Sequence, residues 1–209
     1  MTNLWKRYRV TLQIEGEFAA SVPKTEKEIK AMLEHRMPTH KPVDAQPIED
    51  LAAEVVAEVG ASNEEVQQPG WATFKRDEDG LYYEGRCVRG HVKDCALQVS
   101  KTTGIAGFKA KVANHVYVEE NKIYLGKDKP DGIEKRFIQV MTKPGPRSTF
   151  KFIDYVLDPK LVFVLRVFND GVITKEHLET IFEYGGIHGI GQERGQSWGR
   201  YRLVEMVEL

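Results

Sequence analysis

Cysteine is scarce in this sequence, with only Cys87 and Cys95 in a chain of 209 residues. The two stand eight positions apart in a segment predicted to be helical, which separates them by about 12 Å along the helix axis. That distance is too large for a disulfide, and two thiols alone cannot form a structural zinc site. We therefore expect reduced thiols and a cytoplasmic location.

Long apolar runs are also missing. No segment approaches the roughly 18 consecutive apolar residues that a membrane span needs. The stretch Trp5–Arg9 is polar and no apolar run follows it, unlike a secretory leader. We expect no membrane partner.

The chain has no overall charge excess, since 30 Lys and Arg face 31 Asp and Glu. The charge is uneven, however. Residues 44–66 carry seven acidic side chains and no Lys or Arg, while the segments before and after each have a net charge of +3. Any surface for nucleic acid must therefore be local, and the acidic segment should lie away from it.

Hydrophobic periodicity predicts the N-terminal half. Alternating polar and apolar residues indicate a strand over Tyr8–Phe18. Thr25 and Glu28 form a capping pair for a helix that should end at Pro38. After a linker at 39–47, apolar spacing predicts an amphipathic helix with an acidic face over Ile48–Val59, closed by Gly60.

The second half alternates between strands and helices. Its two predicted helices cover Arg86–Val99 and a segment that begins at the N-cap Thr174 and ends at Gly185-Gly186. The strands and hairpin arms predicted there are Trp71–Lys75, Leu81–Tyr83, Val116–Val118, Ile123–Leu125, Arg136–Met141, Thr149–Leu157, Leu161–Phe168 and Tyr201–Leu209. This order predicts an α+β fold of ferredoxin-like (RRM-like) type, with helices on one face of a sheet.

A glycine-rich loop precedes the last predicted strand, with six glycines over residues 185–199. Glycine lets a ligand approach bare backbone, and exposed N–H groups can hold anions. The loop is neither a Walker loop nor a dinucleotide fingerprint, because it lacks Gly-Lys-Ser/Thr and follows a helix. The residues that could bind phosphate or stack on a base are Gly189, Gly191, Arg194, Gly195, Ser197, Trp198, Gly199 and Arg200. The plain alternative is that the glycines only shape a tight crossing between helix and strand.

A second candidate is the basic start of the Arg86–Val99 helix, where the helix dipole favours anions. Its members are Arg86, Arg89, Gly90, His91 and Lys93. Residues spaced by three and four share a helix face. The patch indicates either a phosphate-binding surface or an ordinary solvated basic face.

The segment Gly189–Tyr201 resembles the C-terminal glycine-rich loop of the RAMP superfamily, the repeat-associated RNA-binding proteins of CRISPR systems. The loop of that family ends in Gly-Phe-Gly-Arg before a strand, and this chain has Ser197-Trp198-Gly199-Arg200 in its place. The Glu84–Asp94 segment resembles the basic helix start of the same family. The resemblance implies a single RAMP-like domain over 1–209 with a helical insertion at 39–66. It also implies RNA as the partner, single-stranded or guide RNA, with other protein subunits or self-association.

Three functions remain open. The first is non-catalytic RNA binding in a CRISPR-type or related ribonucleoprotein complex. The second is a metal-independent endoribonuclease, for which His35 and His188 are the candidate acid–base residues. The third is a protein that reuses the fold for interaction or oligomer formation. The spacing of His and Cys supports no metal site, and we expect no cofactor.

Overall fold

The computed structural model describes residues 3–36, 46–60, 70–142 and 144–209. The chain divides into two compact units. Unit 1 comprises residues 1–19, 82–127 and 156–209, and unit 2 comprises residues 20–81 and 128–155. Both mix helices with strands, so the α+β class is confirmed. The single domain over 1–209 with an insertion at 39–66 stays a prediction.

Unit 1 is built on a four-stranded antiparallel sheet in the order β12, β1, β11, β7. These strands are β1 (Trp5–Ile14), β7 (Val116–Val118), β11 (Lys160–Phe168) and β12 (Tyr201–Glu208). Along β1 and β11 every second residue is buried, so one face of the sheet enters the core and the other stays open. Leu12, Ile14 and Phe163 belong to the buried face and are almost fully enclosed.

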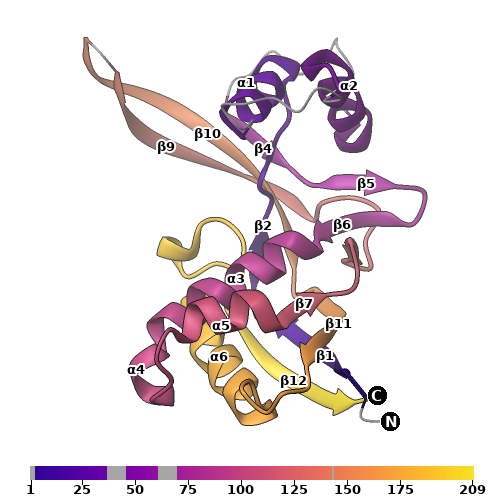
Figure 1. Cartoon of the computed structure of the whole chain (residues 1–209). Helices are drawn as coiled ribbons and strands as arrows, with labels where there is room; N and C mark the ends of the chain where they lie inside the picture. The colour runs from indigo at the N-terminus through magenta and orange to yellow at the C-terminus, as the bar shows by residue number, and fades with distance from the viewer. Residues whose placement is uncertain (1–2, 37–45, 61–69, 143) are drawn as a thin grey trace. The chain divides into compact units, whose positions relative to one another are not determined.

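Helices cover the buried face. The main ones are α3 (Gly85–Gln98), α5 (Phe108–His115) and α6 (Lys175–His188), with the short α4 (Ser100–Thr103) after α3. Figure 1 shows α3 running beside α5 and α6, and α6 also packs on β12. The predicted helix at 86–99 is thus confirmed to within one residue, and Thr174 caps α6 as expected.

The remaining elements of unit 1 are short. They are β2 (Glu17–Ala19), β8 (Lys122–Tyr124) and the 3-10 helix η1 (Arg194–Gln196). The strand β6 (Gly80–Glu84) crosses the division between the units, and its Tyr82–Glu84 part pairs with β8. The strand predicted over 8–18 is interrupted between β1 and β2, where Gly16 has a φ of 82°.

Unit 2 contains β3 (Val22–Pro23), α1 (Glu26–Arg36), α2 (Ile48–Val59), β4 (Trp71–Thr73) and β5 (Lys75–Asp77). Helices α1 and α2 pack on each other through an apolar cluster that includes Ile29, Ala52 and Val55. The helix predicted at 48–59 is confirmed, and Gly60 ends it with φ 62°. Most of the predicted linker and the Pro38 stop lie outside the described residues.

A long antiparallel hairpin completes unit 2. It consists of β9 (Gly132–Thr142) and β10 (Gly145–Leu157), whose last two residues fall in unit 1. The sequence placed only 136–141 and 149–157 in strands, because the polar ends of both arms hide the alternation. The hairpin predicted from Trp71 is partly wrong, since Trp71–Thr73 pairs with β3 and β10 and the 77–80 turn follows β5 instead.

The predicted end of the helix before the glycine-rich loop is wrong. Helix α6 runs through Gly185 and Gly186 to His188, so the loop proper covers residues 189–200. Both glycines are buried, and a Cβ on Gly186 would collide with the carbonyl oxygen of Tyr201. These two glycines therefore allow α6 to lie close on β12.

Candidate nucleic-acid interface

The two patches singled out from the sequence meet in unit 1. Arg194 of the loop extends to Asp94 on α3, with 3.1 Å between Nη1 and Oδ2. The same Nη1 lies 2.7 Å from Nε2 of His188, at the end of α6. His188 Nε2 is also 3.3 Å from Asp94 Oδ2. We call Asp94, His188 and Arg194 the loop cluster.

Donor and acceptor chemistry limits how the side chains of the loop cluster can bond to one another. A guanidinium nitrogen only donates, so Arg194 can bond to His188 only when Nε2 of the imidazole carries a lone pair. Nη1 then gives one hydrogen to His188 and one to Asp94. Partial burial raises the pKa of Asp94, but the hydrogen bond and charge of Arg194, together with the neighbouring His188, outweigh it and keep the pKa below its ordinary value.

A buried polar pair lies beneath the loop cluster. His91 is 6% exposed, and its Nε2 is 2.8 Å from the hydroxyl of Tyr201. Its ring stacks on His188 with 6.4 Å between centroids. Burial, with the nearby His188 and Arg194, lowers the pKa of His91 to about 3, so the ring is neutral. His91, predicted to bind RNA, is instead enclosed among α3, α6 and β12.

The loop glycines have distinct surroundings. A Cβ at Gly189 would lie 2.7 Å from the carbonyl oxygen of Trp198, and one at Gly199 would collide with that of Ile190. A Cβ at Gly191 would lie 3.0 Å from the ring of Phe18. Of the loop glycines, only Gly195 faces open space. The tight-crossing explanation therefore accounts for most of the glycines.

Many backbone N–H groups of the loop already donate hydrogen bonds to backbone carbonyls. Ile190 N–H donates to Gly199 at 2.8 Å, and Gly199 N–H donates to Glu17 at 2.8 Å. The N–H groups of residues 196–198 bond to carbonyls of residues 193 and 194. Arg194, Gly195, Ser197 and Arg200 remain exposed. Any anion held by this loop would therefore depend mainly on side chains.

The basic residues of α3 divide into two kinds. Arg89 donates to the carbonyl of Ala113 at 2.7 Å and lies 4.4 Å above the ring of Tyr117, and its buried Nε has no hydrogen-bond partner in the described part of the chain. Arg86 is exposed and pairs with Glu84. A Cβ at Gly90 would point into open space.

Two candidate cations are available for a ligand. Neither the Lys93 side chain nor the Arg200 side chain has an ion-pair or hydrogen-bond partner among residues 3–36, 46–60, 70–142 and 144–209. Lys93 precedes Asp94 of the loop cluster in the chain, and Arg200 is the last residue of the loop. These two side chains carry positive charge that the described protein does not neutralise.

The catalytic candidates differ in their settings. His188 belongs to the loop cluster and its side chain is 30% exposed. His35 is exposed on α1 in unit 2, and no described residue pairs with it. Within the described ranges no group of three or more His, Cys, Asp or Glu could hold a metal ion. Neither Cys87 nor Cys95 forms a disulfide within the described ranges.

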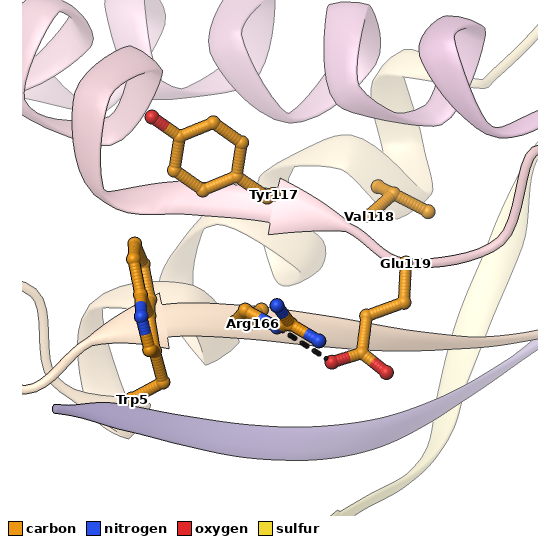
Figure 2. A pocket seen from close by; sticks show the side chains of 5 residues that line it. All are labelled: Trp5, Tyr117, Val118, Glu119 and Arg166. Atoms are coloured by element: carbon orange, nitrogen blue, oxygen red, sulfur yellow. Dashed lines mark hydrogen bonds and ion pairs between the residues drawn. The ribbon is translucent and has the colours of Figure 1, made fainter. Parts of the chain in front are cut away.

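Sequence reasoning missed a pocket of about 420 Å³ in unit 1. It is lined by Trp5, Tyr117, Val118, Glu119 and Arg166 (Figure 2). The first predicted strand began at Tyr8 and left out Trp5, which belongs to β1, and no sequence signal connects Trp5 with β7 and β11. None of the helices in the described ranges is both long and apolar enough to span a bilayer.

Comparison with known proteins gives a limited result. No family model and no curated protein matches the chain. Among solved structures, the chain is similar to one in the cryo-EM structure of the Type III-B Cmr-beta bound to cognate target RNA. The TM-score is 0.48 and the sequence identity 10%, and the match covers 98% of this chain but only 61% of the other.

Proposed function

We propose that this protein binds RNA through phosphate contacts on a surface formed by α3 and the 189–200 loop. The observation that carries the proposal is the contact between Arg194 and Asp94, which brings two separately suspected basic segments together in one unit. Guanidinium and ammonium groups are the usual donors to nucleic-acid phosphates.

The proposed fold is ferredoxin-like. The four strands of the main sheet in unit 1, taken with α3 and α6, follow one another as β1, α3, β7, β11, α6, β12, which is the β-α-β-β-α-β order of that fold, and β2, α4, α5 and β8 are additional short elements. The order of the strands in the sheet, with the first and third strands in the centre, also supports it. A RAMP-type domain with this topology would carry its glycine-rich loop directly before the last strand, as here.

The candidate residues then have different roles. Lys93 and Arg200 contact phosphate directly, because no described residue neutralises them. Arg194 exchanges Asp94 for a phosphate oxygen, and Arg86 does the same with Glu84. Gly195 and Ser197 leave the loop surface open to the backbone of the ligand, and Trp198 is positioned nearby in sequence for base stacking.

The remaining candidates support this surface from within. His91 and Arg89 hold α3 against β12 and β7 by their contacts with Tyr201 and Tyr117. Gly189, Gly191 and Gly199 fix the path of the loop, and Gly90 opens the surface of α3. The protein would act with RNA in the cytoplasm as one subunit of a larger ribonucleoprotein complex, or as a self-associating chain.

Fluorescence anisotropy with a labelled single-stranded RNA tests the proposal. Lys93→Ala and Arg200→Ala should each weaken binding about three- to tenfold, and each should reduce the salt slope by roughly 0.7. The matched control is Arg202→Ala, an exposed arginine two residues further along that pairs with Glu15. Unchanged affinity in both variants, or an equal loss in the control, would refute this surface.

A metal-independent endoribonuclease is the second candidate function. One observation favours it, namely that His188 contacts both a carboxylate and a guanidinium at a partly exposed position. An imidazole beside a group that stabilises negative charge is suited to acid–base cleavage at a 2′-hydroxyl. RNA cleavage in EDTA that His188→Ala abolishes and His35→Ala retains would establish it, and no cleavage of hairpin or repeat RNA would exclude it.

A further inference from the structure

The open face of the unit 1 sheet carries a row of three aligned side chains. Tyr117 on β7 is the register partner of Arg166 on β11, and Arg166 is the partner of Arg7 on β1. Two arginines directly opposite each other on neighbouring strands repel. A negative group between them is therefore required, and the protein provides Glu119.

Glu119 accepts hydrogen bonds from both guanidinium groups. Arg7 donates from Nε and Nη2 to its two oxygens at 3.0 and 2.7 Å, and Arg166 donates from Nε at 2.9 Å. Hydrogen bonds and charge from Arg7, with further help from Arg166, lower the pKa of Glu119. The geometry shows that the row holds an oxyanion in a bidentate manner.

Donor capacity remains after this pairing. In the described part of the chain Glu119 is the sole hydrogen-bonding partner of the Arg166 side chain, which leaves both of its Nη nitrogens available. The Arg7 and Arg166 side chains are 48% and 49% exposed, whereas Glu119 is only 19% exposed. A second oxyanion can therefore approach the guanidinium groups from solvent while Glu119 stays beneath.

Aromatic rings form the other end of the pocket. Trp5 packs edge-on against Tyr117 and Phe168, with centroid distances of 5.8 and 5.4 Å. Arg89 lies over the Tyr117 ring, and the Tyr117 hydroxyl donates to the carbonyl of Asn114. Both pocket rings are therefore fixed in place. Figure 2 shows Trp5 and Tyr117 on one side and the bonded pair of Glu119 and Arg166 on the other.

We propose that this pocket binds a nucleotide. The base would contact Trp5 and Tyr117, and the phosphate would accept from the free Nη groups of Arg166 and from Arg7. A volume of about 420 Å³ lies in the range of small-ligand sites and suits one nucleotide. The proposal goes beyond the RNA surface described above, because no residue that lines the pocket belongs to the loop or to α3.

Two-dimensional ¹H–¹⁵N NMR of the full chain tests the pocket with adenosine 5′-monophosphate as the probe. The Trp5 indole signal, assigned with Trp5→Leu, should shift on titration, and adenosine and ribose 5-phosphate should each bind at least about tenfold more weakly. Arg166→Ala and Trp5→Leu should also weaken binding of the nucleotide about tenfold or more. The matched control Arg202→Ala, on β12 of the same sheet, should bind like wild type.

A short oligoadenylate distinguishes the two sources of the ligand. Binding as tight as that of the mononucleotide would identify a nucleotide within an RNA chain, and much weaker binding would identify a free nucleotide. No shift of the Trp5 indole at millimolar nucleotide, or unaltered affinity in Arg166→Ala, would overturn the proposal. Loss of RNA binding in Lys93→Ala and Arg200→Ala with nucleotide binding intact would separate this pocket from the loop surface.

Discussion

The loop cluster and the pocket on the unit 1 sheet both place a carboxylate next to arginine, but the two sites are built on different supports. In each, one carboxylate lies between two nitrogen-bearing side chains, Asp94 between Arg194 and His188 and Glu119 between Arg7 and Arg166. Glu119 is the more enclosed, with 19% of its side chain exposed against 43% for Asp94. The arginines of the pocket project from paired strands, whereas Arg194 projects from a loop.

This difference in support explains the two proposed ligands. Side chains on paired strands are positioned before a ligand arrives, which suits one compact molecule. Arg194 can leave Asp94 without disturbing a strand, which suits the varied backbone of an RNA chain. The buried contact of His91 with Tyr201 gives the loop cluster a rigid floor.

Gly186→Ala should produce the largest effect. The added methyl group collides with the carbonyl of Tyr201 and separates α6 from β12, and we expect a loss of about 2–3 kcal/mol in the free energy of unfolding. Urea denaturation measures it. The matched control is Gly90→Ala, also within a helix but with open space around it, which should be neutral or stabilise by up to about 1 kcal/mol. Equal effects at the two positions would disprove the close approach of α6 and β12.

His91→Gln should make the free energy of unfolding less dependent on pH than it is in wild type. His91 has an ordinary pKa of 6.5 and a folded pKa of about 3, so the folded protein resists protonation. Its stabilising effect is complete above pH 6.5 and declines as the pH falls towards 3, by about 1.4 kcal/mol per unit. Between pH 7 and 5 wild type should lose about 2 kcal/mol more than the variant. Parallel pH profiles in denaturant titrations would mean that the buried ring is charged.

Glu119→Gln removes the charge between two facing arginines. We expect a loss of about 1 kcal/mol at pH 7, because the cross-strand repulsion of Arg7 and Arg166 is no longer offset. The lowered pKa of Glu119 means that this contribution is present above 4.5 and disappears as the pH falls through the lower folded value. The two proteins should therefore converge in acid, and a constant difference down to pH 2 would contradict the role of the carboxylate charge.

Asp94→Asn should have the smallest effect on folding. The side chain is 43% exposed, so solvent screens its interaction with Arg194 and the change should stay within about 0.5 kcal/mol. RNA affinity should rise, since Arg194 no longer has a competing carboxylate. Anisotropy titrations against wild type measure the change, and weaker RNA binding would mean that Asp94 positions Arg194 for the ligand and does not compete with it.

Local signals in the sequence predicted much of the fold. The alternation in β1 and β11, the apolar spacing in α2 and α3, and the caps at Thr174 and Gly60 each depend on neighbours in the chain. The end of α6 was misjudged because a glycine pair usually breaks a helix, whereas tertiary contact with Tyr201 selects glycine here.

The sites were less predictable. The sequence singled out Arg194 and the α3 patch. It could not show that Arg89 and His91 form hydrogen bonds within the protein, to the Ala113 carbonyl and the Tyr201 hydroxyl. The pocket combines three residues that are distant in the chain. Trp5 and Tyr117 are over a hundred positions apart, and Tyr117 and Arg166 are nearly fifty apart. The pairing of β1 with β11 and of β11 with β7 brings them together, and strand register is a property of the folded sheet.

Photocrosslinking tests the central claim most directly. A single-stranded RNA that carries 4-thiouridine would be irradiated with the full chain, and the attachment sites would be mapped by mass spectrometry. We predict attachment within residues 189–200 and 86–94, lost in the Lys93→Ala and Arg200→Ala double variant and retained in Arg202→Ala. Attachment confined to the β9–β10 hairpin or to α1 and α2 would contradict an RNA surface at the glycine-rich loop.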